Sequence, residues 1–372
     1  QFTDELWETP YVDKLQLIAV DHPESVGVHI DERFTLPPYD KPEIHTVANK
    51  IFPVAATDGK GDDVLPALRQ IDKQYVAGFA TTDFQGISER HELILDPGQI
   101  DAKQPVKLFL HGWVFPTDAS INVAMAQSDN HQSQAPNVSV INENGDWQTV
   151  IPNIGFPKGK NKMVIVDLTG KFLSDDHRVR IQTNMQIYWN QAFFTVGETA
   201  APVAETVMDP VTADLHYRGF SLVNRATPYS PHIPDYSQVS TEQKWRDLTG
   251  FYTRYGDVLP LLTASDNQYV IMNAGDEITL EFDASVLPAL QDGWSRDFLF
   301  YNDGWLKDGD LNTALGYKVK PLPFHGMSSY PYPGNEDYPE NTEHQEFIEK
   351  YNTREVTGLE FQNALKHFTE SK

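Results

Sequence analysis

The chain of 372 residues contains no cysteine. Disulfide bonds, thiolate metal sites and cysteine nucleophiles are therefore excluded. Basic residues are also scarce, because 29 Lys and Arg stand against 53 Asp and Glu, for a formal net charge of -24. Such a surface repels phosphate backbones and anionic lipids, so we expect no nucleic acid partner. No apolar run approaches the roughly 18–20 residues that a spanning helix needs, and we expect no membrane insertion.

The short motifs of several large enzyme classes are also missing. The sequence has no GxSxG, no Walker motif and no GxGxxG, and its 12 histidines form no HExxH pair. These absences favour a protein without catalytic activity. Paired carboxylates for glycoside hydrolysis stay open as an alternative, because such pairs meet in space and not in sequence.

What the sequence does contain is an internal repeat. The run DVLPALRQIDKQYV from Asp63 is matched by DVLPLLTASDNQYV from Asp257. Two further matches follow in the same order: HELILD from His91 with DEITLE from Asp276, and LFLHGW from Leu108 with LFYNDGW from Leu299. Three ordered matches favour duplication over chance, and a repeat fixes the architecture before other features are interpreted. The sequence therefore predicts two related units.

Short apolar runs with alternating polarity, separated by turn signals about every 8–12 residues, are typical of β-sandwiches. We predict a mostly β protein with two related β-sandwich, jelly-roll-like units at 1–200 and 201–335, and a short helical C-terminal tail at 336–372. The first unit opens with a strand that includes Val12 and Leu15, and a second copy of this strand is expected from Tyr188.

The tail carries two helix signals. A capping-box pattern opens the stretch Thr342–Tyr351, and apolar residues recur at helical spacing over 357–368. This apolar stripe can pack on its own unit or dock on a partner, and the sequence leaves both alternatives open.

One polar cluster has the composition of a cation site. The run DGWLKDGDLN from Asp303 places alternating carboxylate and amide oxygens in a glycine-containing loop, and Ca²⁺ takes six to eight oxygen ligands. The candidate calcium ligands are Asp303, Asp308, Asp310 and Asn312. Their spacing is not that of an EF-hand, and a solvated β-turn is the alternative interpretation.

Aromatic residues near expected loops suggest a ligand-binding face. Exposed rings stack on the apolar faces of sugars, while neighbouring polar groups bind the hydroxyls. The candidate ligand-binding residues are His111, Trp113, Trp305, His325 and Tyr330. Core packing of the rings and buried, hydrogen-bonded histidines are the alternatives.

Four longer runs carry a family resemblance: HYRGFS from His216, WRDLTGFYTRYGDV from Trp245, VIMNAGDE from Val270 and RDFLFYNDGWLKDGDLNTA from Arg296. They resemble the C-terminal region of large secreted bacterial proteins with FG-GAP repeats and an ASPIC/UnbV segment. The resemblance implies export and a role in binding or surface interaction, and it supplies no catalytic residues. The chain lacks the Asp-x-Asp-x-Asp-Gly propeller repeats of that family, so we expect the terminal part of a larger chain or a stand-alone relative.

These observations predict an exported, non-catalytic binding or assembly module that recognises carbohydrate or a protein partner, with Ca²⁺ ordering the loop at 303–312. The expected location is secreted or at the cell surface, with the periplasm as an alternative. A start at Gln1 in place of Met fits a processed exported form or an excised piece. Two other functions stay open: a structural subunit of an extracellular filament or large complex, and a polysaccharide-acting enzyme.

Overall fold

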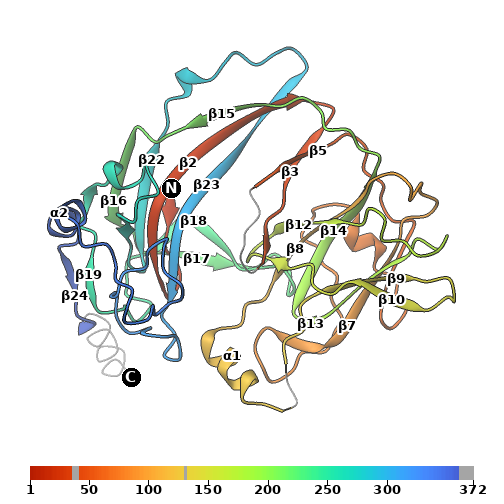
Figure 1. Ribbon diagram of the computed structural model, residues 1–372, viewed down its shortest axis with the longest axis horizontal. Helices are drawn as coiled ribbons and strands as arrows, with labels where there is room; N and C mark the ends of the chain where they lie inside the picture. Colours follow the sequence, from red (N-terminus) through yellow and green to blue (C-terminus); the bar gives the residue numbers. More distant parts are fainter. Residues whose placement is uncertain (36–41, 130–131, 360–372) are drawn as a thin grey trace. The chain divides into compact units, whose positions relative to one another are not determined.

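The computed structural model describes residues 1–35, 42–129 and 132–359 (Figure 1). Strands make up 42% and helices 8%, which confirms the predicted mostly β fold. Among the described residues, no helix is both long and apolar enough to cross a membrane.

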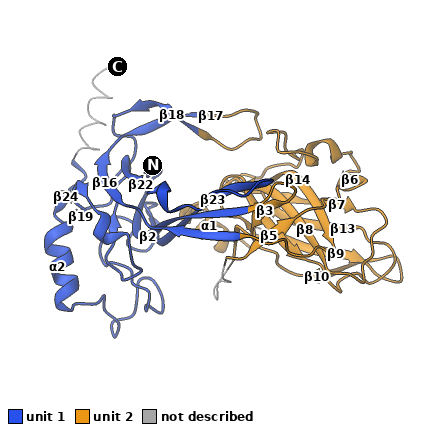
Figure 2. Ribbon diagram, turned by 90° about the horizontal axis from the view of Figure 1, so that it is seen from above, with its two compact units in different colours: residues 1–21, 204–223, 234–372 blue, residues 22–203, 224–233 orange. Residues whose placement is uncertain are grey.

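The chain forms two compact units (Figure 2). Unit 1 comprises residues 1–21, 204–223 and 234–372, and unit 2 comprises residues 22–203 and 224–233. The segments expected from the sequence, 1–200, 201–335 and 336–372, differ from this division in three respects, one of which is that residues 224–233 belong to unit 2. The first 21 residues group with the C-terminal half, and the helix after residue 341 belongs to unit 1.

In the residues that the structure describes, unit 2 consists of short strands with one α-helix and one 3₁₀ turn. In chain order its elements are β3 (Gly27–Ile30), β4 (Arg33–Phe34), β5 (Ile44–Val47), β6 (Ala55–Asp58), η1 (Leu65–Leu68), β7 (Ile87–Asp96), β8 (Val106–Val114), α1 (Ala119–Ala126), β9 (Asn137–Ile141), β10 (Trp147–Ile151), β11 (Phe156–Pro157), β12 (Lys162–Asp167), β13 (Val179–Met185) and β14 (Ile187–Val196).

Two antiparallel sheets enclose the core of unit 2. One has the strand order β10-β9-β13-β7-β6 and the other β12-β8-β14, while β3-β5 and β4-β11 form two-stranded sheets. Alternate residues of the strands point inward, so Leu93 and Leu95 of β7 share one apolar cluster with Leu108 and Leu110 of β8. This two-layer packing buries the apolar face of both larger sheets. The finer jelly-roll description stays a prediction.

Unit 1 uses strands from both ends of the chain. The elements are β1 (Phe2–Thr3), β2 (Glu8–Pro23), β15 (Ala204–Met208), β16 (Thr212–Tyr217), β17 (Phe220–Asn224), β18 (Ile233–Ser240), β19 (Gly250–Tyr252), β20 (Gly256–Asp257), η2 (Leu259–Leu261), β21 (Val270–Ile271), β22 (Asp276–Glu281), η3 (Ala284–Val286), β23 (Trp294–Asp308), α2 (Thr342–Tyr351) and β24 (Arg354–Val356). Strands β2, β17 and β18 each run one or two residues beyond the unit's bounds.

Two four-stranded sheets dominate unit 1. One has the order β1-β22-β16-β20, and the other has β15-β2-β21 with β23 also paired to β2. The long strands β2 and β23 lie side by side in Figure 1. The pairs β17-β18 and β19-β24 complete the unit. Tyr11 and Leu15 of β2 lie in one apolar cluster with Ile278 of β22, so the N-terminal strand is part of this core.

Helix α2 packs on its own unit. The side chains of Phe347 and Tyr351 lie in the core cluster of unit 1. The helix is capped by Asn341, whose side chain accepts the N–H of His344, one residue before the expected capping box. The expected stripe at 357–368 lies mostly outside the described residues.

The segments that match in sequence also match in backbone structure. In each copy the side chain of the first residue accepts a hydrogen bond from the backbone N–H two residues later. Asp63 accepts from Leu65 at 2.9 Å, and Asp257 accepts from Leu259 at 3.0 Å. Lys73 and Asn267 occupy the same position of the repeat, and each has a φ of 69°, which is uncommon for residues other than glycine. The repeat thus preserves an unusual turn and not only residue types.

Strand pairing matches as well. Ala56 of β6 pairs with Leu95 of β7, and at the corresponding place Ala213 of β16 pairs with Leu280 of β22. Strand β13 pairs with β7 on its other side, as β1 pairs with β22. The strands β6, β7 and β13 of unit 2 therefore correspond to β16, β22 and β1 of unit 1.

Two glycines show the remaining correspondence. A Cβ at Gly112 of β8 would lie 2.4 Å from the carbonyl oxygen of Tyr188 in β14. A Cβ at Gly304 of β23 would lie 2.2 Å from the carbonyl oxygen of Tyr11 in β2. Strands β8 and β14 of unit 2 thus correspond to β23 and β2 of unit 1. The strand pair at the end of unit 2, β13–β14, has its counterpart at the start of the chain, β1–β2.

Candidate functional site

The expected calcium ligands do not converge on one point. Asp303 and Asp308 both lie in β23, five residues apart, so they point to opposite faces and are separated by roughly 17 Å. After the strand, Asp308 accepts the N–H of Asp310 at 2.9 Å, and Asp310 accepts the N–H of Asn312 at 2.7 Å. These bonds stabilise turns in the chain, as in the solvated β-turn that was the alternative to a calcium site. One ion could not bind Asp303 together with the other three residues.

Asp303 instead lies in a different cluster, with Asp13 of β2 and His325. One potential ligand atom from each residue lies within 4.8 Å of the other two. The Nε2 atom of His325 lies 3.5 Å from Oδ2 of Asp303, and its Nδ1 atom lies 3.5 Å from Oδ2 of Asp13. The side chain of Asp13 is 0% exposed, while those of Asp303 and His325 are 25% and 40% exposed. The cluster is therefore buried on one side and open on the other.

Asn267 fixes the orientation of the imidazole. Its Oδ1 atom accepts the backbone N–H of His325 at 2.8 Å and lies 2.8 Å from Nδ1 of the same residue. Because a backbone N–H can only donate, this atom of Asn267 is the amide oxygen, and Nδ1 carries the proton. The other ring nitrogen, Nε2, faces Asp303 at 3.5 Å.

The two carboxylates are also held in place. Asp13 accepts the backbone N–H groups of Asp266 and Asn267 at 3.2 and 3.1 Å. Burial raises the pKa of Asp13 to about 6, although these two bonds and nearby His325 oppose the rise. Asp303 accepts a hydrogen bond from the hydroxyl of Ser265. These contacts position the three side chains before any ligand arrives.

An aromatic pocket of about 380 Å³ lies next to this cluster in unit 1. Trp305, two positions after Asp303 and on the same face of β23, contributes to its wall and meets the ring of His325 edge to face, with centroids 5.8 Å apart. Other lining residues are Tyr11, Lys307, Asp308, Thr313 and Tyr330. The structure thus brings three of the five predicted ligand-binding residues together: Trp305, His325 and Tyr330.

Lys307 is a buried cation in this pocket. Its Nζ atom donates to the carbonyl oxygens of Lys318 and Val319 at 3.0 and 2.9 Å, and it lies 4.8 Å from the centroid of the Tyr330 ring. Burial lowers the pKa of Lys307 to about 8. The ammonium group therefore has fixed partners and a fixed position in the pocket.

The other two predicted ligand-binding residues lie in unit 2. Trp113 is 3% exposed, stacks on Tyr188 with centroids 5.0 Å apart, and donates its Nε1–H to the carbonyl of Tyr229 at 2.9 Å. His111 forms a 2.6 Å hydrogen bond between Nδ1 and Oδ1 of Asn190. Core packing and a hydrogen-bonded histidine, the alternatives from the sequence, describe these two residues.

Sequence reasoning missed Asp13 and Asn267. Asp13 is far from Asp303 in sequence and joins it only because β2 pairs with β23. The internal repeat contained a signal for Asp13. When YVDK from Tyr11 is aligned with YWNQ from Tyr188, Asp13 takes the position of Asn190. When Gly304-Trp305 is aligned with Gly112-Trp113, Asp303 takes the position of His111. The polar pair thus has no carboxylate in unit 2 and two carboxylates in unit 1.

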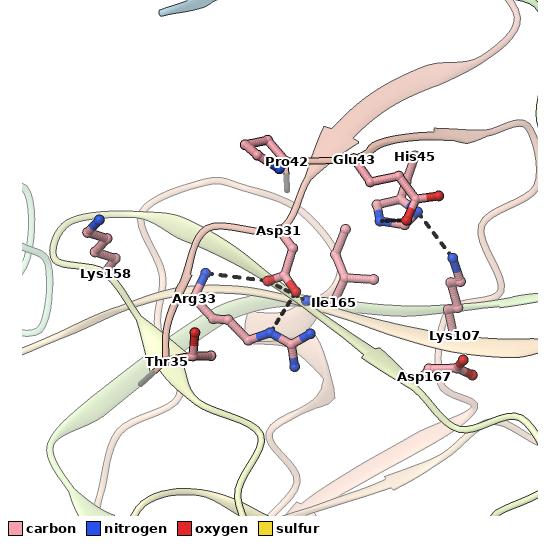
Figure 3. A pocket seen from close by; sticks show the side chains of 10 residues that line it. All are labelled: Asp31, Arg33, Thr35, Pro42, Glu43, His45, Lys107, Lys158, Ile165 and Asp167. Atoms are coloured by element: carbon pink, nitrogen blue, oxygen red, sulfur yellow. Dashed lines mark hydrogen bonds and ion pairs between the residues drawn. The ribbon is translucent and has the colours of Figure 1, made fainter. Parts of the chain in front are cut away.

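Unit 2 has a larger pocket of about 600 Å³ with a different character (Figure 3). Its charged lining residues are balanced in sign: Arg33, Lys107 and Lys158 against Asp31, Glu43 and Asp167. Arg33 pairs with Asp31 at 2.6 Å, and Lys107 lies 3.2 Å from Nδ1 of His45. Burial and then the Lys107 ammonium lower the pKa of His45. Within the described part of the chain, the Lys, Arg, Asp and Glu residues of the lining thus sum to no net charge.

Glu8 of β2 provides a pH-dependent test of the polar groups around the aromatic pocket. Burial, and then the carboxylate of Asp308, raise the pKa of Glu8 to about 7. The folded state therefore holds a proton that the unfolded state loses above its ordinary pKa near 4.5. Stability contributed by Glu8 accordingly falls as the pH rises from about 4.5 to 7.

Replacing Glu8 with glutamine removes this penalty. We expect Glu8→Gln to raise the free energy of unfolding by about 1–2 kcal/mol at pH 8 and to leave it nearly unchanged at pH 4, allowing for partial solvation of the group. Urea denaturation at the two pH values measures the difference. Glu242→Gln, at an exposed loop position, serves as the control and should show no such pH dependence. An equal effect of Glu8→Gln at both pH values would contradict the prediction.

Comparisons with known proteins returned no matching family model, no matching curated protein and no matching solved structure. The resemblance to FG-GAP and ASPIC/UnbV proteins therefore stays a prediction.

Proposed function

We propose that the chain is an exported, non-catalytic binding module whose ligand is a carbohydrate bound in the aromatic pocket of unit 1. The observation that carries the proposal is the lining of this pocket, where Trp305 and Tyr330 stand beside the polar groups of Asp308 and Thr313. Its volume of about 380 Å³ lies in the range of small-molecule sites, roughly 300–1,000 Å³.

The chemistry of the pocket suits a neutral sugar. Aromatic faces bind the C–H faces of a sugar ring, and carboxylate and hydroxyl groups bind its hydroxyls. Two of the three N–H donors of Lys307 already have carbonyl partners, so the ammonium is largely satisfied within the protein. A strongly anionic ligand would also have to approach a chain with a net charge of -24.

A glycan array followed by calorimetry with the strongest binder tests the proposal. We expect Trp305→Ala to weaken binding by about 10- to 100-fold, because a buried aromatic contact contributes about 1.5–3 kcal/mol. Trp147→Ala changes a partly exposed tryptophan of unit 2 outside the pocket and should leave affinity unchanged. Circular dichroism of both variants verifies folding. No glycan bound by the wild type, or equal affinity of Trp305→Ala, would refute the carbohydrate ligand; a protein partner is then the alternative to pursue by pull-down.

A polysaccharide-acting enzyme is the second candidate, for one specific reason. The raised pKa of Glu8 keeps a proton on a carboxyl group near neutral pH, and its neighbour Asp308 lines the pocket. A protonated acid beside a carboxylate is the equipment of glycoside hydrolysis. Release of reducing sugar from an array-positive glycan, lost in Glu8→Gln, would favour the enzyme over the binding module.

A further inference from the structure

We propose that Asp13, Asp303 and His325 bind a divalent transition-metal ion such as Zn²⁺. The inference is independent of the carbohydrate proposal, because it concerns the neighbouring cluster and is tested with the metal alone. It shares only Asp303 with the calcium site expected at 303–312, and it differs from that site in the class of ion.

The geometry of the cluster fits one small ion. Two ligand atoms bound to a tetrahedral zinc at about 2.1 Å lie roughly 3.4 Å apart. The Nε2 atom of His325 lies 3.5 Å from both carboxylate oxygens of Asp303. Asp13 places a further oxygen within 4.8 Å of one ring nitrogen of His325 and one carboxylate oxygen of Asp303. Small side-chain rotations would therefore bring all three ligands to an ion, and the open side of the cluster admits water as a fourth.

The surrounding contacts have the arrangement that supports metal-bound histidines. Such a histidine donates its second ring N–H to a carbonyl or carboxylate, which fixes the tautomer and turns the other nitrogen toward the metal. Asn267 is in this role, since its amide oxygen accepts from Nδ1 of His325 at 2.8 Å. Ser265 binds the carboxylate of Asp303 in the same supporting way.

Unit 2 provides an internal comparison. At the positions of Asp13 and Asp303 it has Asn190 and His111, which hydrogen-bond to each other at 2.6 Å and carry no carboxylate. The fold therefore does not require acids at these two positions. In unit 1 both positions are acidic and a separate loop supplies His325, so two carboxylates are gathered where a histidine and an asparagine suffice for packing. A bound cation accounts for that difference.

The donor set selects the class of ion. Imidazole nitrogen suits Zn²⁺ and other first-row transition metals, whereas Ca²⁺ and Mg²⁺ prefer sites made of oxygen atoms alone. One nitrogen with two carboxylates therefore favours Zn²⁺ over Ca²⁺.

Isothermal titration of the EDTA-treated, full-length chain with ZnCl₂, and separately with CaCl₂, tests the site. We expect one Zn²⁺ per chain and weaker or no binding of Ca²⁺. His325→Ala and Asp303→Asn should each lower the affinity for Zn²⁺ at least tenfold. Asn267→Gly keeps the backbone conformation accessible but removes the acceptor for Nδ1, and should lower it about tenfold.

His216 is a matched control. It also lies between two carboxylates of unit 1, with Nδ1 3.2 Å from Asp214 and Nε2 3.5 Å from Glu277. Arg218 lies 3.2 Å from Glu277 and neutralises it, so His216→Ala should leave Zn²⁺ affinity unchanged. Co²⁺ gives a second readout, a visible absorption band that His325→Ala removes. Absence of Zn²⁺ binding, binding unaffected by both ligand variants, or tighter binding of Ca²⁺ would overturn the proposal.

Discussion

Replacing Gly304 with alanine is expected to destabilise unit 1 severely, and Gly112→Ala should do the same to unit 2. In each case the added Cβ meets a backbone carbonyl of the neighbouring strand, at 2.2 and 2.4 Å. A backbone oxygen cannot rotate away as a flexible side chain can, so the paired strands must separate. We expect each variant to lose about 3 kcal/mol of unfolding free energy, at the upper end of the cost of overpacking. Urea denaturation followed by tryptophan fluorescence measures the loss.

Gly334→Ala is the control for this pair. A Cβ at Gly334 would meet no atom within 4 Å, and no positive φ is present there to oppose a side chain. Its unfolding midpoint should stay close to that of the wild type. If Gly304→Ala and Gly112→Ala unfold at the same urea concentration as Gly334→Ala, the close approach of the paired strands does not constrain these two positions.

The second large effect is expected from Arg354→Leu. The guanidinium of Arg354 binds Asp276, whose side chain is 0% exposed, and stacks over the ring of Tyr255 with 4.2 Å to the centroid. Without Arg354, Asp276 is a buried carboxylate with no cation beside it. Loss of one partner of a buried ion pair costs about 3–5 kcal/mol, so we expect Arg354→Leu to unfold at much lower urea concentration at pH 7.

The pH dependence of this variant distinguishes charge from packing. Burial raises the pKa of Asp276 even with Arg354 beside it, and removal of Arg354 raises it further. The penalty is therefore present above the unfolded pKa and declines as the pH falls and Asp276 binds a proton. The double variant Asp276→Asn, Arg354→Leu should recover part of the loss at pH 7.

An exposed ion pair supplies the comparison. Arg178 and Asp176 have side chains that are 46% and 36% exposed, so Arg178→Leu should cost less than about 1 kcal/mol. A loss in Arg354→Leu that is as small as this, or that does not change with pH, would contradict the buried-charge explanation.

The internal repeat could be found from the sequence because the two copies share short runs of similar residues that form the same local turns. The segments from Asp63 and Asp257 share an acidic first residue, a proline turn and a residue with positive φ, and these features depend only on near neighbours. Alternating apolar residues likewise predicted the strands, since a half-buried strand alternates whatever it pairs with. The mostly β fold followed from such local rules.

The candidate site depends on pairing between distant strands, which local rules do not specify. The sequence predicts a single loop for the four expected calcium ligands, but Asp303 lies inside a long strand. The two GW pairs illustrate the same limit: Trp113 is buried in an aromatic cluster, whereas Trp305 lines a pocket. Nothing in the two residues themselves distinguishes these environments.

The position of β1 and β2 also sets an order of events during protein synthesis. The strands that complete unit 1 are translated first, but β23, which pairs with β2, begins only at Trp294. At about 5–20 residues per second, roughly 15–50 s separate the emergence of the two strands from the ribosome. The main segment of unit 2, residues 22–203, is made entirely within that interval. During that interval β2 lacks its long partner β23, and its first partner strand, β15, begins only at Ala204. The main segment of unit 2 is therefore complete before β2 can pair with any strand of its own sheet.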